Sequence, residues 1–148
     1  MSSLFLMLAS LAHAVPTPST SQTALYNAMK MRENAPDCSE LKQYSDTVAD
    51  DLLWLMDNAN QPPWVGIRAA QCILTDHAVE KARVIDGWVV DPDRRGLAIL
   101  ALGMLDTLPE PVALRLAKKA LAGPLAADAK KRIANSKRPA VKALLPSP

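Results

Sequence analysis

The fold is decided by the stretch ARVIDGWVVDPDRRGLAILAL, residues 82–102. Each half carries apolar residues at the three- and four-residue steps of one helix face, namely Ala82, Ile85 and Val89 in the first half and Ala98 and Leu102 in the second. Asp91 and Pro92, between the two halves, are typical of a helix start, because Asp accepts free amide hydrogens and Pro lacks one. The stretch therefore predicts two helices joined by a turn.

The same double pattern occurs once before and once after this stretch. The earlier copy has Leu52, Leu55, Ala59, Ala69 and Ile73, and the later copy has Ala113, Leu116, Ala120, Ala129 and Ile133. Equivalent positions lie about 30 residues apart, a period typical of stacked helical units. The sequence thus predicts an all-α fold, a short α-solenoid of about three stacked antiparallel helical hairpins. Apolar residues are 49% of the chain but aromatic residues only 4%, which also favours helices with small side chains in the core.

Turn residues divide the chain into expected helices. We expect a short helix at residues 23–31, one long helix at 37–58 and, after a turn at 61–63, a return helix with Val65, Ala69, Cys72 and Ile73 on its inner face. A helix capped by Thr75 or Asp76 with Val79 buried should follow, then helices from 91, 109 and 124, with residues 141–145 as an end cap. Gly123 is expected in a left-handed conformation at the end of the helix from 109.

The N-terminal residues resemble an export signal. Residues 4–12 are an apolar run followed by Ala12-His13-Ala14, a small-x-small site that predicts cleavage before Val15. The run lacks a preceding Lys or Arg, so a frayed apolar N-terminus is the alternative. The expected organisation is a signal peptide at 1–14, a flexible lead-in with a short helix at 15–36 and a helical repeat domain at 37–145. The expected location is exported, periplasmic or extracellular, and no segment is long enough to span a membrane.

Residues 91–103, DPDRRGLAILALG, resemble the second helix of a short HEAT-type repeat of about 30 residues. Arg95, the small pair Ala98-Ile99 and the triplet Ala101-Leu102-Gly103 carry the resemblance, which is weaker in the other two copies. It implies a curved platform that binds proteins, or sometimes nucleic acids, with no shared active site. The alternative is an unrelated irregular helical bundle.

No motif for catalysis, a cofactor or a metal is found in the sequence. His77 is the only histidine after the expected signal, which excludes His-rich metal sites, and no Gly-rich phosphate loop, Cys-x-x-Cys or Gly-x-Ser-x-Gly occurs. We therefore expect a non-enzymatic protein with no catalytic residues and no cofactor.

The charge distribution is uneven. Residues 15–114 contain 8 basic and 14 acidic residues, whereas residues 115–148 contain 9 basic residues and Asp128 alone. The candidate anion- or partner-binding residues are Lys118, Lys119, Lys130, Lys131 and Arg132. A basic cluster attracts an acidic protein, an anionic surface or nucleic acid, and the alternative is a solvated face without a partner.

Trp64 and the two cysteines are the remaining candidates. Trp64 follows two prolines at a turn, where it either anchors a partner or folds back onto the hairpin end.

Cys38 and Cys72 would form a disulfide in an oxidising compartment. If both helices were straight, however, the two residues would be offset along the helix axes by roughly 12 Å. The bond requires that the first long helix break, near Tyr44-Ser45-Asp46, and otherwise two free thiols remain.

These observations predict an interaction platform for another macromolecule, most simply a protein that cannot be identified from the sequence, with the basic C-terminal hairpin as its contact. The alternative function is binding of nucleic acid or an anionic surface through that hairpin.

Overall fold

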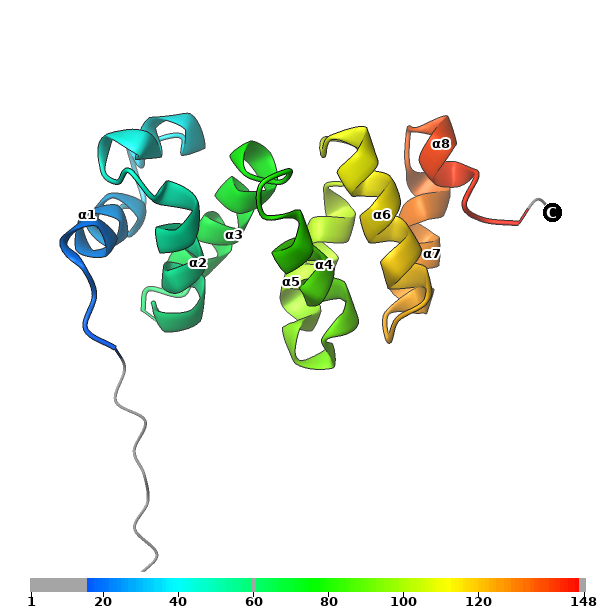
Figure 1. The fold of residues 1–148 in the computed structure, drawn as a ribbon, viewed down its shortest axis with the longest axis horizontal. Coiled ribbons are helices and arrows are strands. Elements are labelled where there is room, and N and C mark those ends of the chain that lie inside the picture. Colours follow the sequence, from blue (N-terminus) through cyan, green and yellow to red (C-terminus); the bar gives the residue numbers. More distant parts are fainter. Residues whose placement is uncertain (1–15, 60, 147–148) are drawn as a thin grey trace, which may run out of the picture.

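The computed structural model describes residues 16–59 and 61–146, and these residues form helices, turns and loops without a β-strand. The expected signal peptide at residues 1–14 lies outside the described residues. The helices are α1 (Thr20–Met29), the 3-10 helix η1 (Cys38–Gln43), α2 (Val48–Asn58), α3 (Trp64–Asp76), α4 (Ala82–Val90), the 3-10 helix η2 (Pro92–Arg94), α5 (Arg95–Gly103), α6 (Glu110–Leu121), α7 (Ala126–Asn135) and α8 (Pro139–Lys142). They follow one another along the long axis of the molecule, from α1 at one end to α8 at the other (Figure 1).

Neighbouring helices pack as successive pairs. Helix α2 contacts α3, α4 contacts α5 and α6 contacts α7, while α3, α5 and α7 also contact one another in series and α4 contacts α6. Helices α3, α5 and α7 begin at residues 64, 95 and 126, which are 31 residues apart. The period of the structure therefore agrees with the period of the apolar pattern.

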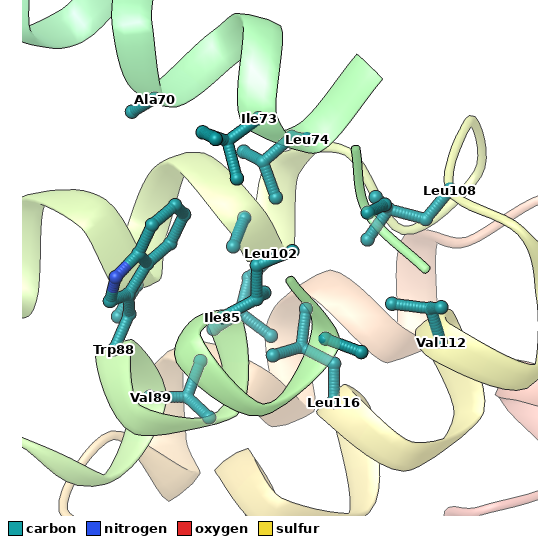
Figure 2. Packing of buried hydrophobic residues seen from close by; sticks show 14 of the residues in the cluster. Ala70, Ile73, Leu74, Ile85, Trp88, Val89, Leu102, Leu108, Val112 and Leu116 are labelled. Carbon is teal, nitrogen blue, oxygen red and sulfur yellow. The ribbon is translucent and has the colours of Figure 1, made fainter. Parts of the chain in front are cut away.

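The apolar stripes form the core. All apolar residues that define the three copies of the sequence pattern are buried, except Ala59, which is half-buried. Figure 2 shows how this core crosses from pair to pair: Ile73 of α3, Ile85 of α4, Leu102 of α5 and Leu116 of α6 lie in one cluster. Ala98, Leu102, Ile85 and Leu116 are buried, as their place in the apolar stripes predicts, whereas Lys118 and Lys131 lie outside the stripes and are exposed.

The prediction of one long helix at 37–58 is wrong. The chain is helical at 38–43 and again from Val48, with a break between them. In the break, the Ser45 hydroxyl accepts a hydrogen bond from the Thr47 amide and donates one to Asp51. Such local side-chain bonds give the backbone an alternative to helix, which explains the interruption.

Two further local predictions are wrong. Thr75 and Asp76 belong to the end of α3, and Val79 lies in the turn that follows, where it is 70% exposed. Gly123 does not have a positive φ. Its small size is required for another reason, since a Cβ atom there would lie 3.1 Å from the Val89 carbonyl oxygen. Gly123 thus permits close packing of the turn after α6 on α4.

The start of the fifth α-helix is as predicted. The Asp91 carboxylate accepts a hydrogen bond from the Asp93 amide at 2.9 Å, and Pro92 opens η2, which leads directly into α5. At the C-terminal end, Val141 is fully buried, and α8 packs on α6 and α7 as the predicted end cap.

Helix α1 is packed against the helices that follow it, so the expected boundary at residue 37 does not separate it from them. Its Leu25, Ala28 and Met29 are buried, and it contacts both α2 and α3. The buried Asp51 carboxylate of α2 accepts hydrogen bonds from Ser21 and Gln22 of α1 at 2.7 and 3.1 Å.

We predict that Asp51 makes stability sensitive to acid. Burial is the largest single influence and raises the pKa of Asp51, but the hydrogen bonds from Ser45, Ser21, Gln22 and Thr47 together outweigh it and hold the pKa below its ordinary value of 3.8. A carboxyl group with a lowered pKa in the folded state stabilises the fold above the unfolded-state pKa and loses this contribution as pH falls through the folded-state pKa. Urea unfolding from neutral pH into the region below pH 3.8 should therefore show a falling midpoint.

The control for this prediction is Asp51→Asn, which removes the titrating group. The variant should be less stable than the parent at neutral pH and should lose less of its stability in acid. An equal loss in both proteins would show that other carboxylates cause the acid sensitivity.

Candidate interaction groove

A groove lies between the first two helix pairs. Its larger part is a cavity of about 830 Å³ lined by Asp57, Ile67, Asp91, Asp93, Arg94, Gly96, Leu97, Ile99 and Leu100. A second cavity of about 260 Å³ shares Asp57, Asp91 and Arg94 and is walled by Leu53 and Met56 of α2 and Val84 of α4. We call these two cavities together the Arg94 groove.

The walls of the Arg94 groove are apolar and partly open to solvent. Ile67 of α3 is 55% exposed and Val84 of α4 is 38% exposed, while Leu97 and Leu100 of α5 are half-buried. Ile67 belongs to α3, whereas Leu97 and Leu100 belong to α5, and these two helices contact each other across the boundary between the pairs. Apolar side chains gathered in a hollow and left uncovered are typical of a ligand or protein contact.

Charged groups lie where the two cavities meet. Arg94 Nη1 is 3.1 Å from Asp57 Oδ1, and Arg94 Nε is 3.8 Å from Asp91 Oδ2. Arg94 therefore joins α2 to the start of α5, across the boundary between the first two pairs. Asp93 also lines the groove, so three carboxylates and one guanidinium give it an acidic rim.

Arg94 lies outside the apolar stripe of Ala98 and Leu102, and the sequence therefore predicts an exposed side chain. The side chain is only 38% exposed, because it reaches across to Asp57. The Arg94 groove corresponds to no motif in the sequence. The available signal was the presence of Ile67, Leu97 and Leu100 outside the buried stripes of their helices.

The candidate basic residues lie on two helices that pack against each other. Lys118 and Lys119 are on α6, whereas Lys130, Lys131 and Arg132 are on α7, and all five are exposed. Lys118 of α6 and Lys131 of α7 each lie on the face of their helix opposite to its buried residues.

Part of the positive charge stabilises the fold itself. Asp86 of α4 is buried, and its Oδ2 lies 2.9 Å from Arg115 Nε and 3.6 Å from Lys119 Nζ of α6. Lys119 is therefore less available to a partner than the other four candidates.

Trp64 contacts the segment that follows α1. Its indole N–H donates to the Lys30 carbonyl at 3.1 Å, and the Arg32 guanidinium lies 4.7 Å from the centre of the ring. The side chain is half-buried. This arrangement favours the interpretation that Trp64 folds back onto the protein over the interpretation that it anchors a partner.

Cys38 and Cys72 are joined by a disulfide, with their Cα atoms 5.1 Å apart. The bond connects η1 to α3, two elements that also contact each other directly. Two straight helices would hold the two cysteines apart along the helix axes. The break between η1 and α2 removes this offset, so the disulfide can form.

His77 and the acidic residues are, by residue type, possible metal ligands among the described residues. His77 lies after α3 with Nδ1 3.4 Å from Glu80, and no cluster of three His, Cys, Asp or Glu side chains in the described residues is placed to hold a metal ion. Among these residues no helix is long and apolar enough to cross a membrane.

Comparison with known proteins gives no relative. The chain matches no protein-family profile, no curated protein and no solved structure.

Proposed function

We propose that this protein is a non-enzymatic helical-repeat platform of HEAT-like type that binds another protein in the Arg94 groove. The repeat interpretation is supported by the 31-residue spacing of α3, α5 and α7 and by polar contacts made across about one repeat. Lys81 bonds Asp50 over 31 positions, Ser136 bonds Asp106 over 30, and Arg95 bonds Asp128 over 33. In a stacked array each unit contacts its neighbours in this way.

The observation that carries the binding proposal is the uncovered apolar wall of the Arg94 groove together with its acidic rim. The partner that fits is an amphipathic segment with apolar residues for the two cavities and Lys or Arg beside them. Its apolar side chains would pack on Ile67, Leu97 and Leu100, and its cations would lie near Asp57, Asp91 and Asp93.

The disulfide supports the proposal that the protein is exported to the periplasm or the extracellular space. Disulfides persist in oxidising compartments and are rare in the cytosol. The N-terminal apolar run is consistent with this location.

We predict that a synthetic amphipathic peptide of Leu and Lys, with Leu at helical spacing, binds the protein and that Ile67→Ser weakens this binding about tenfold. Ile67 is largely exposed, so the substitution should leave stability nearly unchanged. Fluorescence anisotropy of the labelled peptide measures the affinity.

Two controls separate groove binding from general hydrophobic adhesion. Val79→Ser changes an even more exposed apolar residue outside the groove and should leave the affinity unaltered. A peptide with Glu in place of Lys should bind much more weakly because of the acidic rim. Unchanged affinity in Ile67→Ser would refute the groove as the binding site.

The second candidate function is binding of nucleic acid or an anionic surface through the C-terminal residues, favoured by their excess of positive charge. If it is correct, replacing Lys118, Lys119, Lys130, Lys131 and Arg132 by Gln should abolish retention on heparin while thermal stability changes little, since exposed charges contribute little to stability. Elution of parent and variant at the same salt concentration would exclude this function.

A further inference from the structure

A separate pocket, of about 520 Å³, lies between α1 and α2. On α1, Gln22 and Tyr26 are four residues apart and Asn27 is adjacent, and on α2, Trp54 and Asn58 are four apart. Residues four apart share one face of a helix, so each helix presents an aromatic ring with an amide beside it. Gln61, after α2, closes the pocket. We call this the amide pocket.

None of the described residues that line the amide pocket is charged, although 22% of the chain is charged. The Arg94 groove, by contrast, has four charged residues in its lining. A pocket without charges offers no compensation for the desolvation of an ion, so its preferred ligand is neutral.

The polar groups of the amide pocket are suited to hydroxyl groups. A side-chain amide supplies both donors and an acceptor, and a hydroxyl likewise donates and accepts. Asn58 uses its Nδ2 to donate to the Trp54 carbonyl at 2.8 Å, which leaves its Oδ1 as an acceptor. Within the described residues the side chains of Asn27 and Gln61 make no hydrogen bond, and both are exposed.

The two aromatic side chains supply flat apolar surfaces that are held in place. The Tyr26 hydroxyl donates to the Gln61 carbonyl at 2.7 Å, which fixes the ring at the edge of the pocket. Trp54 is half-buried, so part of its indole is accessible. The negative face of an aromatic ring attracts weakly positive C–H groups.

We propose that the amide pocket binds a neutral saccharide. A sugar ring combines an apolar C–H face, which would lie against Trp54 or Tyr26, with a rim of hydroxyl groups, which would bond Asn27, Asn58 and Gln61. The volume of the pocket is within the range of small-ligand sites. This proposal is independent of the Arg94 groove, since the two sites have no lining residue in common.

The experiment is isothermal titration of the full chain with maltotriose, cellotriose and triacetylchitotriose, together with tryptophan fluorescence. At least one of these sugars is expected to bind. Trp54→Leu, which keeps apolar volume but removes the aromatic face, should weaken that binding about tenfold, whereas Trp54→Phe should retain most of it. Ile67→Ser, in the Arg94 groove, should bind the sugar as the parent does.

Asn27→Ala is a second variant for the case that substitution of Trp54 disturbs folding. Asn27 is exposed on α1, and its loss should weaken sugar binding about fivefold while circular dichroism is unchanged. The proposal is overturned if none of the three sugars binds at millimolar concentration, or if affinity is equal in parent, Trp54→Leu and Asn27→Ala. It is also overturned if only a proline-rich peptide, which is likewise neutral and packs on aromatic rings, occupies the pocket.

Discussion

Truncation of Leu102 to Ala is expected to lower the free energy of unfolding by about 2 to 5 kcal/mol. Leu102 is 1% exposed and lies at the centre of the cluster that joins α3, α4, α5 and α6 (Figure 2). Its removal leaves a cavity between helix pairs, and these contacts are what hold a stacked array together. Urea denaturation monitored by circular dichroism measures the change.

The matched control is Ile67→Ala, which removes a side chain of the same size from an exposed position on α3. Its effect should be within about 0.5 kcal/mol, as is usual for surface substitutions. A loss of less than about 0.5 kcal/mol for Leu102→Ala as well would contradict the assignment of Leu102 to the buried apolar stripe.

Removal of the disulfide is expected to cost about 2 to 4 kcal/mol, because the bond closes a loop with a sequence separation of 34 and restricts the unfolded chain. Comparison of the oxidised protein with the double variant Cys38→Ala/Cys72→Ala in the same urea series gives this difference. Alanine is used in place of serine because Cys72 is only 5% exposed, and a serine there would bury a hydroxyl group.

Thiol labelling gives the outcome that would contradict this prediction. If the unfolded but unreduced protein reacts with a thiol reagent at both cysteines, no bond is present. The case for export through an oxidising compartment would then be weakened as well.

The core was largely predictable because it depends on local periodicity. The steps from Ala98 to Leu102 and from Ile85 to Val89 place each pair on one helix face, and a face that repeats every 30 residues has to be covered by its neighbours. The turn at Asp91-Pro92 was predictable for the same reason, since its capping contacts are made within a few residues.

The interruptions of helices were less predictable because they depend on competition between contacts. Ser45 and Thr47 are compatible with a helix, and the break forms where their hydroxyl groups bind the buried Asp51. Gly123 resembles an ordinary helix terminator, whereas its role is set by Val89 of another helix.

The candidate sites could not be predicted from the sequence because both lie between elements distant along the chain. Ile67 and Leu97 are ordinary apolar residues of α3 and α5 until the packing of the two pairs leaves them uncovered. The basic residues were conspicuous in the sequence, but the structure distributes them over α6 and α7 and pairs Lys119 with Asp86. Charge counts alone do not show this separation.

The most direct test of the central claim is to map the bound Leu/Lys peptide on the isotopically labelled protein by amide chemical shifts. The account predicts that the largest changes occur around Ile67, Leu97 and Leu100, between the first two helix pairs, and that residues of α6 and α7 change little. Changes concentrated at Lys118, Lys130 and Lys131 instead would contradict it.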